Sequence, residues 1–174
     1  MRWFVECKPD ETLVVSLGIP ARSVEHAASR DRVCAQLQRL DQVIGMMDED
    51  PHAHPLPYLQ SLEVLHNAHA VRVLMDRRRN NRVILLCPRL EPWLVRAARE
   101  AGLRLTDFGF EHDDGKGLHA EINQRLESLR RLVGELLARK EPGMMALREA
   151  LHEKSILTFP HPTHEHPLPL SPQL

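Results

Sequence analysis

The stretch that decides the fold is Gln42-Val43-Ile44-Gly45-Met46-Met47-Asp48-Glu49-Asp50. Its first part, residues 42–47, is apolar enough to form a buried β-strand, and it runs directly into three acidic residues. In an extended chain, Asp48 and Asp50 would point to the same side, because side chains alternate with a period of two. We therefore predict a strand that ends in a pair of neighbouring carboxylates.

The residues before this stretch predict alternating strands and helices. A strand at 3–5, a helix at about 9–17, a strand at 22–26 and a helix capped by Ser29 precede the strand at 42–47. Such alternation favours a parallel sheet, whose active site lies at the carboxyl ends of the strands. Glu6 ends the first strand, so we expect it to lie at the same edge as Asp48 and Asp50.

The second half predicts further strands at about 62–65, 71–74 and 83–87, followed by helices at 90–101, 118–137 and 145–152. The helix at 118–137 has an apolar stripe, and its length of about 30 Å exceeds what a small sheet needs. Its surplus predicts a homodimer contact or a surface for a partner protein. We expect one α/β domain over residues 1–158, with a core at 2–101, a helical extension at 116–152 and a Pro/His-rich tail at 159–174.

The composition excludes several classes of protein. The chain has 174 residues, of which 43% are hydrophobic, and its net charge of −1 comes from 23 Lys and Arg against 24 Asp and Glu. That balance argues against a generally basic nucleic-acid coat. The three cysteines form no CxxC pair, so we expect free thiols. No apolar run approaches the roughly 18 residues of a membrane span, so we expect no membrane partner and a soluble, cytoplasmic protein.

Two carboxylates at the end of a strand repel each other unless a positive charge lies between them. A hard divalent cation, Mg²⁺ or Mn²⁺, accepts oxygen ligands and is the usual solution. Glu6, at the end of a neighbouring strand, would add a third ligand or a general base. The alternative interpretation of Asp48 and Asp50 is a solvated acidic turn.

Two motifs in this order resemble the Toprim domain, the metal-binding module of topoisomerases, primases, recombination proteins and the overcoming-lysogenization-defect nucleases. They are Phe4-Val5-Glu6-Cys7-Lys8-Pro9-Asp10-Glu11 and Met47-Asp48-Glu49-Asp50-Pro51, and the resemblance covers about residues 2–88. It implies a Rossmann-like, mostly parallel sheet and a Mg²⁺ site with Glu6, Asp48 and Asp50 as catalytic residues and Asp10 as a further ligand. The family has Gly after the Glu, where this chain has Cys7.

A third segment, Cys87-Pro88-Arg89-Leu90-Glu91-Pro92-Trp93-Leu94, resembles a Pro-x-x-Glu-x-Trp-Leu segment of small stand-alone Toprim-like proteins of bacteria and archaea. The resemblance implies that Glu91 opens a helix near the metal site and adds another ligand. The positive end of the helix dipole favours an anion at this position. Equally, Glu91 is interpreted as an ordinary first-turn residue beside a buried Trp93.

The resemblance implies a metal-dependent phosphodiesterase that hydrolyses DNA or RNA. The single tyrosine, Tyr58, lies in a proline-rich loop, which argues against a topoisomerase. The alternative is a non-catalytic binding or regulatory module, including a subunit of a defence or toxin–antitoxin assembly. Cys7 and the near-neutral charge favour this alternative.

Candidate phosphate contacts are Lys8 in the first motif and a basic turn with Arg77, Arg78 and Arg79, close to Arg82. A basic turn of this kind contacts the phosphate backbone or is simply solvated. His52 and His54 follow the acidic stretch and are interpreted as ligands for a softer metal or, more simply, as exposed loop residues.

Overall fold

The computed structural model describes residues 1–153, which form a six-stranded sheet in the order β2-β1-β3-β6-β5-β4. The first four strands in that order run parallel, while β5 and β4 are antiparallel to their neighbours. The strands are β1 (Trp3–Val5), β2 (Val24–His26), β3 (Ile44–Asp48), β4 (Glu63–Ala68), β5 (Val71–Asp76) and β6 (Asn81–Leu86). This confirms an α/β fold with a mostly parallel sheet, compatible with a Rossmann-like architecture.

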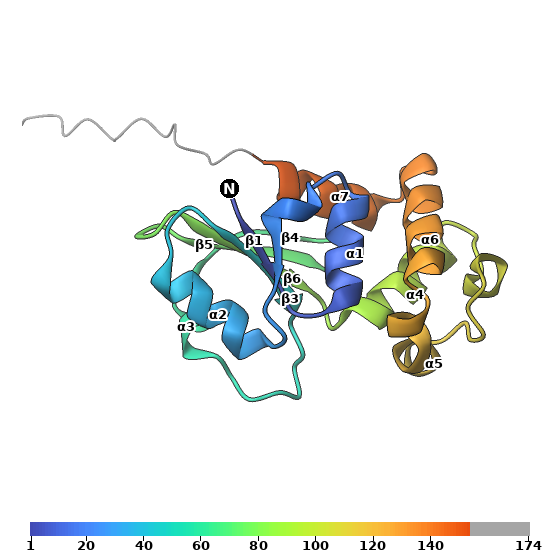
Figure 1. Cartoon of the computed structure of the whole chain (residues 1–174), viewed down its shortest axis with the longest axis horizontal. Helices are drawn as coiled ribbons and strands as arrows, with labels where there is room; N and C mark the ends of the chain where they lie inside the picture. Colours follow the sequence, from blue (N-terminus) through green and yellow to red (C-terminus); the bar gives the residue numbers. More distant parts are fainter. Residues whose placement is uncertain (154–174) are drawn as a thin grey trace, which may run out of the picture.

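Helices cover both faces of the sheet (Figure 1). The core on one face is shared by α1 (Lys8–Ser16), α4 (Leu90–Glu100), α5 (Gly115–Glu121), α6 (Leu126–Ala138) and α7 (Pro142–His152). The other face carries α2 (Arg30–Arg39) and the short α3 (Pro57–Gln60). Three short 3₁₀ turns complete the described chain, at Ala21–Ser23, Leu105–Phe108 and Ile122–Gln124.

The sequence of strand β6 is almost continuously apolar because both of its faces are covered. Ile84 and Leu86 belong to the core on the α1 side, and Val83 and Leu85 to the core on the α2 side. A parallel strand with helices on both faces has no solvated side, so both of its faces are apolar.

Helix α2 approaches β3 closely at Gly45. A Cβ atom at this position would lie 2.8 Å from a side-chain carbon of Leu37 and 2.8 Å from one of Val33. Glycine therefore lets the helix pack directly on the strand that carries Asp48.

The prediction of a single long helix over residues 118–137 is wrong. The structure ends α5 at Glu121 and starts α6 at Leu126, with Arg125 outside the helical region at φ −122° and ψ 43°. The break turns both halves of the apolar stripe toward one core, where Leu118, Leu129 and Leu132 are fully buried. The stripe of α6 is therefore covered within the chain, which removes the main reason to predict a dimer contact there.

The segment predicted as a loop at 51–57 leads into α3, which the sequence did not indicate. None of the helices in residues 1–153 combines the length and the apolar character needed to cross a bilayer. The predicted tail at 159–174, and the end of the predicted domain at 158, lie outside the described residues.

Candidate metal centre

Glu6 and Asp48 meet at the carboxyl edge of the sheet. Strands β1 and β3 are parallel neighbours, with Val5 opposite Met46, so Glu6, which follows β1, and Asp48, which ends β3, come to the same edge. The Asp48 N–H donates to Glu6 Oε2 at 3.4 Å. The Leu90 N–H donates to Asp48 Oδ1 at 2.8 Å, which ties the start of α4 to the end of β3. The structure thus brings these two predicted residues together.

Asp10 lies deeper than the other acids, in the first turn of α1, and is 2% exposed. The backbone N–H and the Sγ of Cys7 both donate to Asp10 Oδ2, at 3.0 and 3.1 Å. Within the described chain, Asp10 Oδ1 is buried and has no hydrogen-bond partner. Because buried oxygens are nearly always satisfied, this atom is an available ligand for a cation.

Burial and mutual repulsion disfavour the charged forms of these acids. Burial, with the charges of Asp10 and Glu6, raises the pKa of Asp48 to about 8. Burial also raises the pKa of Asp10 to about 7, and the charge of Glu6 adds to the rise although the hydrogen bond from Cys7 opposes it. The pKa of Glu6 is raised as well, chiefly by burial. A divalent cation would reverse these shifts, since it favours the ionised form of every carboxylate near it.

Glu91 lies beside the same group, as its position in the first turn of α4 suggested. Its charge contributes to the raised pKa values of Glu6, Asp10 and Asp48. Glu91 Oε1 is 2.8 Å from Nδ1 of His119, a mostly exposed residue of α5. Sequence reasoning missed His119, because no local pattern connects it with a residue 28 positions away.

Asp50 departs from the predicted arrangement. The expected alternation requires an extended backbone, but Asp50 has φ +41°, in the left-handed region. The Asp50 N–H donates to the Pro88 carbonyl at 2.9 Å, and Asp50 Oδ1 is 3.4 Å from Arg89 Nε. The extended backbone on which the same-side prediction for Asp48 and Asp50 rested is therefore absent at Asp50. Asp50 still lies near the group, since its charge raises the pKa of Glu6.

Lys8, a predicted phosphate contact, pairs with a carboxylate of its own helix. Its Nζ is 2.7 Å from Glu11 Oε2, one turn along α1, and more than half of the Lys8 side chain is exposed. The pair with Glu11 occupies the Lys8 ammonium within the chain, and a phosphate contact by Lys8 stays a prediction.

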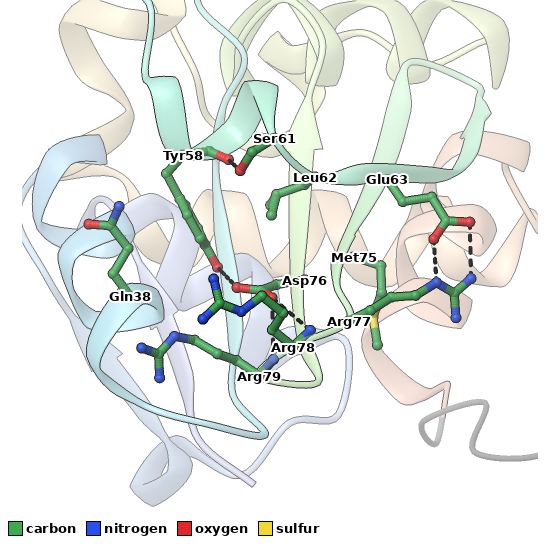
Figure 2. Close-up of a pocket in the computed structure, with 10 residues that line it drawn as sticks. All are labelled: Gln38, Tyr58, Ser61, Leu62, Glu63, Met75, Asp76, Arg77, Arg78 and Arg79. Carbon is green, nitrogen blue, oxygen red and sulfur yellow. Dashed lines mark hydrogen bonds and ion pairs between the residues drawn. The ribbon is translucent and has the colours of Figure 1, made fainter.

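The arginine turn lies at the opposite edge of the sheet. Arg82 at the start of β6 faces Ile44, whereas Leu86 at its end faces Asp48. Residues 77–79 precede β6 and therefore cannot share a phosphate with Asp48. Figure 2 shows them around a cavity of about 580 Å³, where Arg77 pairs with Glu63. A contact between this turn and a distant part of a nucleic acid stays a prediction.

Two other expectations concern histidines and cysteines. His54 Nε2 is 3.1 Å from Asp31 Oδ1 in an exposed pair, as for an ordinary loop residue. The three cysteines are free thiols, as predicted.

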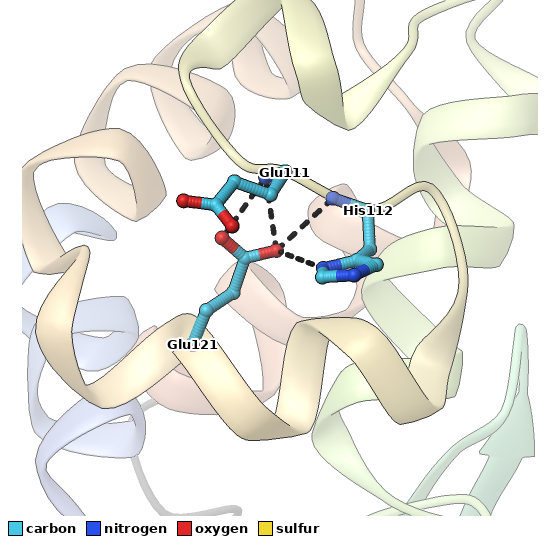
Figure 3. Close-up of side chains that lie close together, drawn as sticks. All are labelled: Glu111, His112 and Glu121. Atoms are coloured by element: carbon cyan, nitrogen blue, oxygen red, sulfur yellow. Dashed lines mark hydrogen bonds and ion pairs between the residues drawn. The ribbon is translucent and has the colours of Figure 1, made fainter.

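A second group of ligand-type residues was not predicted. Glu111, His112 and Glu121 place one ligand atom each within 4.8 Å of one another, and no other trio among residues 1–153 does so (Figure 3). Glu121 already accepts the backbone N–H groups of Glu111 and His112, and its Oε2 is 2.7 Å from Arg125 Nε. These contacts give the group a structural role: they hold residues 109–112 against α5 and Arg125.

The acids at the carboxyl edge are more widely spaced than Glu111, His112 and Glu121. Asp10 and Asp48 each accept backbone N–H groups through one oxygen. Such an arrangement suits a cation that keeps part of its water shell, as Mg²⁺ does. The protein-family models, the curated proteins and the solved structures include no significant match to this chain.

Proposed function

We propose that this protein is a divalent-metal-dependent phosphodiesterase that hydrolyses nucleic acid, with Mg²⁺ or Mn²⁺ as its ion. The observation that carries the proposal is the contact of Glu6 with the Asp48 backbone at the carboxyl edge of the sheet, with the charge of the buried Asp10 acting on both carboxylates. Ligands bind at this edge in open α/β sheets. The Toprim-like motifs of the sequence point to the same residues and the same chemistry.

The proposed ligands are oriented by the backbone. Asp48 gives one oxygen to the Leu90 N–H, and Asp10 gives one to Cys7. Each keeps its second oxygen for the ion, and fixed carboxylates of this kind are typical of metal sites. Glu91 and Asp50 would complete the negative surroundings as outer ligands.

The chemistry divides between the ion and the chain. The ion would supply a Lewis acid that activates water and neutralises charge on the phosphate. Glu6 would act as the general base, accepting a proton from the attacking water. Its raised pKa, caused chiefly by burial, brings it closer to the neutral range in which a base works best.

A non-catalytic binding or regulatory module is the second candidate. The observation that favours it is the pairing of nearby cations within the chain. Arg72 lies 2.7 Å from Glu49, and Arg89 lies 3.4 Å from Asp50, so both have carboxylate partners already. A module of this kind would bind a divalent ion or a partner without cleaving nucleic acid, for example as a subunit of a defence or toxin–antitoxin assembly.

Cleavage assays decide between the two candidates. Purified protein is incubated with single- and double-stranded DNA and RNA in the presence of Mg²⁺, Mn²⁺ or Ca²⁺. We expect cleavage with Mg²⁺ or Mn²⁺ but not with Ca²⁺, which is larger and polarises water less. Glu6→Gln and Asp48→Asn should abolish it while circular dichroism stays unchanged.

The matched control is Glu111→Gln, which alters the other acidic group and should leave cleavage unchanged. Cleavage that persists in both Glu6→Gln and Asp48→Asn would come from a contaminant. Divalent-ion binding without cleavage of any substrate would favour the non-catalytic module.

A further inference from the structure

A cleft of about 410 Å³ opens beside the acidic group, on the face of the sheet that carries α2 and α3. Glu49 and Asp50 line it at the carboxyl edge, and Arg30 and Arg72 line it as well. Its apolar wall comes from the segment around α3, from β5 and from β6, and consists of Leu56, Leu59, Leu62, Leu74 and Leu85. Charged groups at one end and an apolar wall are the usual features of a site for a small organic ligand.

Arg30 connects this cleft with the acidic group. It is the first residue of α2, a helix that follows β2 and therefore begins at the carboxyl edge. The positive charge of Arg30 acts on Glu6, whose pKa it lowers against the larger effect of burial. Arg30 thus lies within electrostatic reach of the proposed general base while it lines the cleft.

The Arg30 guanidinium also has an unused donor. Its Nε atom is buried, and no hydrogen-bond acceptor in residues 1–153 reaches it. Arg72, in contrast, is paired with Glu49. A buried guanidinium N–H without an acceptor is costly, and a phosphate oxygen is the acceptor that best matches its geometry.

We propose that this cleft binds one nucleotide unit of the substrate, with Arg30 contacting its phosphate and the leucine wall covering its base. The phosphate end would then point toward Glu6 and Asp48, and the base would lie against β5 and β6. A nucleobase has a flat apolar face, which aliphatic side chains cover without reading the sequence. The inference rests on the proposed function, because it places this nucleotide next to the phosphate that is cleaved.

The test measures binding of a nucleoside 5′-monophosphate to the protein by NMR chemical-shift changes and by calorimetry. Each titration is done once in Ca²⁺ and once in EDTA. Arg30→Gln should weaken binding about tenfold or more, because a charge-assisted hydrogen bond is lost. The matched control is Arg32→Gln, an exposed arginine on the same helix, which should bind as the wild type does. Ala53→Leu, which fills the cleft, should weaken nucleotide binding but leave inorganic phosphate binding unchanged.

The outcomes separate this inference from the proposed function. If Ca²⁺ binds and Arg30→Gln retains wild-type affinity for the nucleotide, the assignment of the cleft is wrong while the metal centre stands. If no divalent ion binds, the proposed function fails, and the EDTA titrations still decide whether the nucleotide uses Arg30. Inorganic phosphate that binds as tightly as the nucleotide, or shift changes confined to residues 77–79, would also overturn the assignment.

Discussion

Asp48 carries two roles at once, because it holds the start of α4 and faces other buried acids. Asparagine keeps the oxygen that accepts the Leu90 N–H but removes the charge. Asp48→Asn should therefore leave the fold intact and lower the electrostatic cost of the metal-free protein. The resulting gain in stability depends on pH, because the charge of Asp48 in the wild-type protein depends on pH.

The number of protons bound to the folded and the unfolded state decides how the stability difference between Asp48→Asn and wild type changes with pH. Folded Asp48 keeps its proton up to a pKa of about 8, whereas the unfolded chain loses it near 3.8. The folded state therefore holds more protons between these values, and wild-type stability falls as the pH rises through that range. We expect the advantage of Asp48→Asn in free energy of unfolding to grow from pH 5 to pH 8, by at most about 1.4 kcal/mol per pH unit.

Urea unfolding in EDTA at several pH values measures this difference, and titration of unrelated groups cancels between the two proteins. Asp41→Asn is a suitable control, because Asp41 is an exposed carboxylate paired with Arg79. An Asp48→Asn variant that is less stable than wild type at pH 8 would show that the carboxylate is needed for folding.

At the scale of the elements, a substitution in the helices after β6 tests whether these helices and the sheet share one core. Leu132 of α6 is fully buried among residues of α1, α4 and the sheet. Leu132→Ala should destabilise the whole protein by about 2–5 kcal/mol, the usual cost of such a cavity. Arg130→Ala, on the exposed side of the same helix, should cost little.

Chemical unfolding followed by both fluorescence and circular dichroism measures the effect. We expect one cooperative transition at a lower urea concentration in Leu132→Ala. Two separate transitions, with the sheet unaffected, would mean that residues 116–152 form an independent appendage.

The elements also show how far local sequence patterns reach. Strand β3, the Ser29 cap of α2 and the start of α4 follow from apolar runs and capping residues, and the structure confirms them. The break at Arg125 has no proline or glycine beside it. At the break, the Arg125 side chain contacts Glu121, four residues earlier, and donates to the carbonyl of Gly109, sixteen residues earlier, which no local pattern around residue 125 indicates.

The same limit applies to the candidate site. The proximity of Glu6 and Asp48 was predictable, because Glu6 follows β1 and Asp48 ends β3, and the two strands are parallel. The left-handed backbone of Asp50 depends on contacts that alternation does not encode. The pair of Lys8 with Glu11, in contrast, has the i,i+3 spacing of neighbours on one helix. Arg30 was not singled out, because its importance appears only once α2, β5 and β6 are seen around one cleft.

For the whole molecule, the small net charge conceals an uneven distribution. Buried acids gather at the carboxyl edge of the parallel strands, while Arg77, Arg78 and Arg79 lie at the opposite edge. Without a cation, the acids reduce their repulsion by retaining protons near neutral pH. A divalent ion must displace those protons, so its binding and the pH are linked.

The most direct test of the metal centre is a calorimetric titration of the wild-type protein with Mn²⁺ at pH 7 in buffers of different ionisation enthalpy. We predict one ion per chain and the release of protons, because Asp48 and Asp10 have pKa values of about 8 and about 7 without metal. Asp48→Asn should lose this binding, whereas Glu111→Gln should retain it. Binding that is unchanged in Asp48→Asn but lost in Glu111→Gln, or the absence of any binding, would contradict the account.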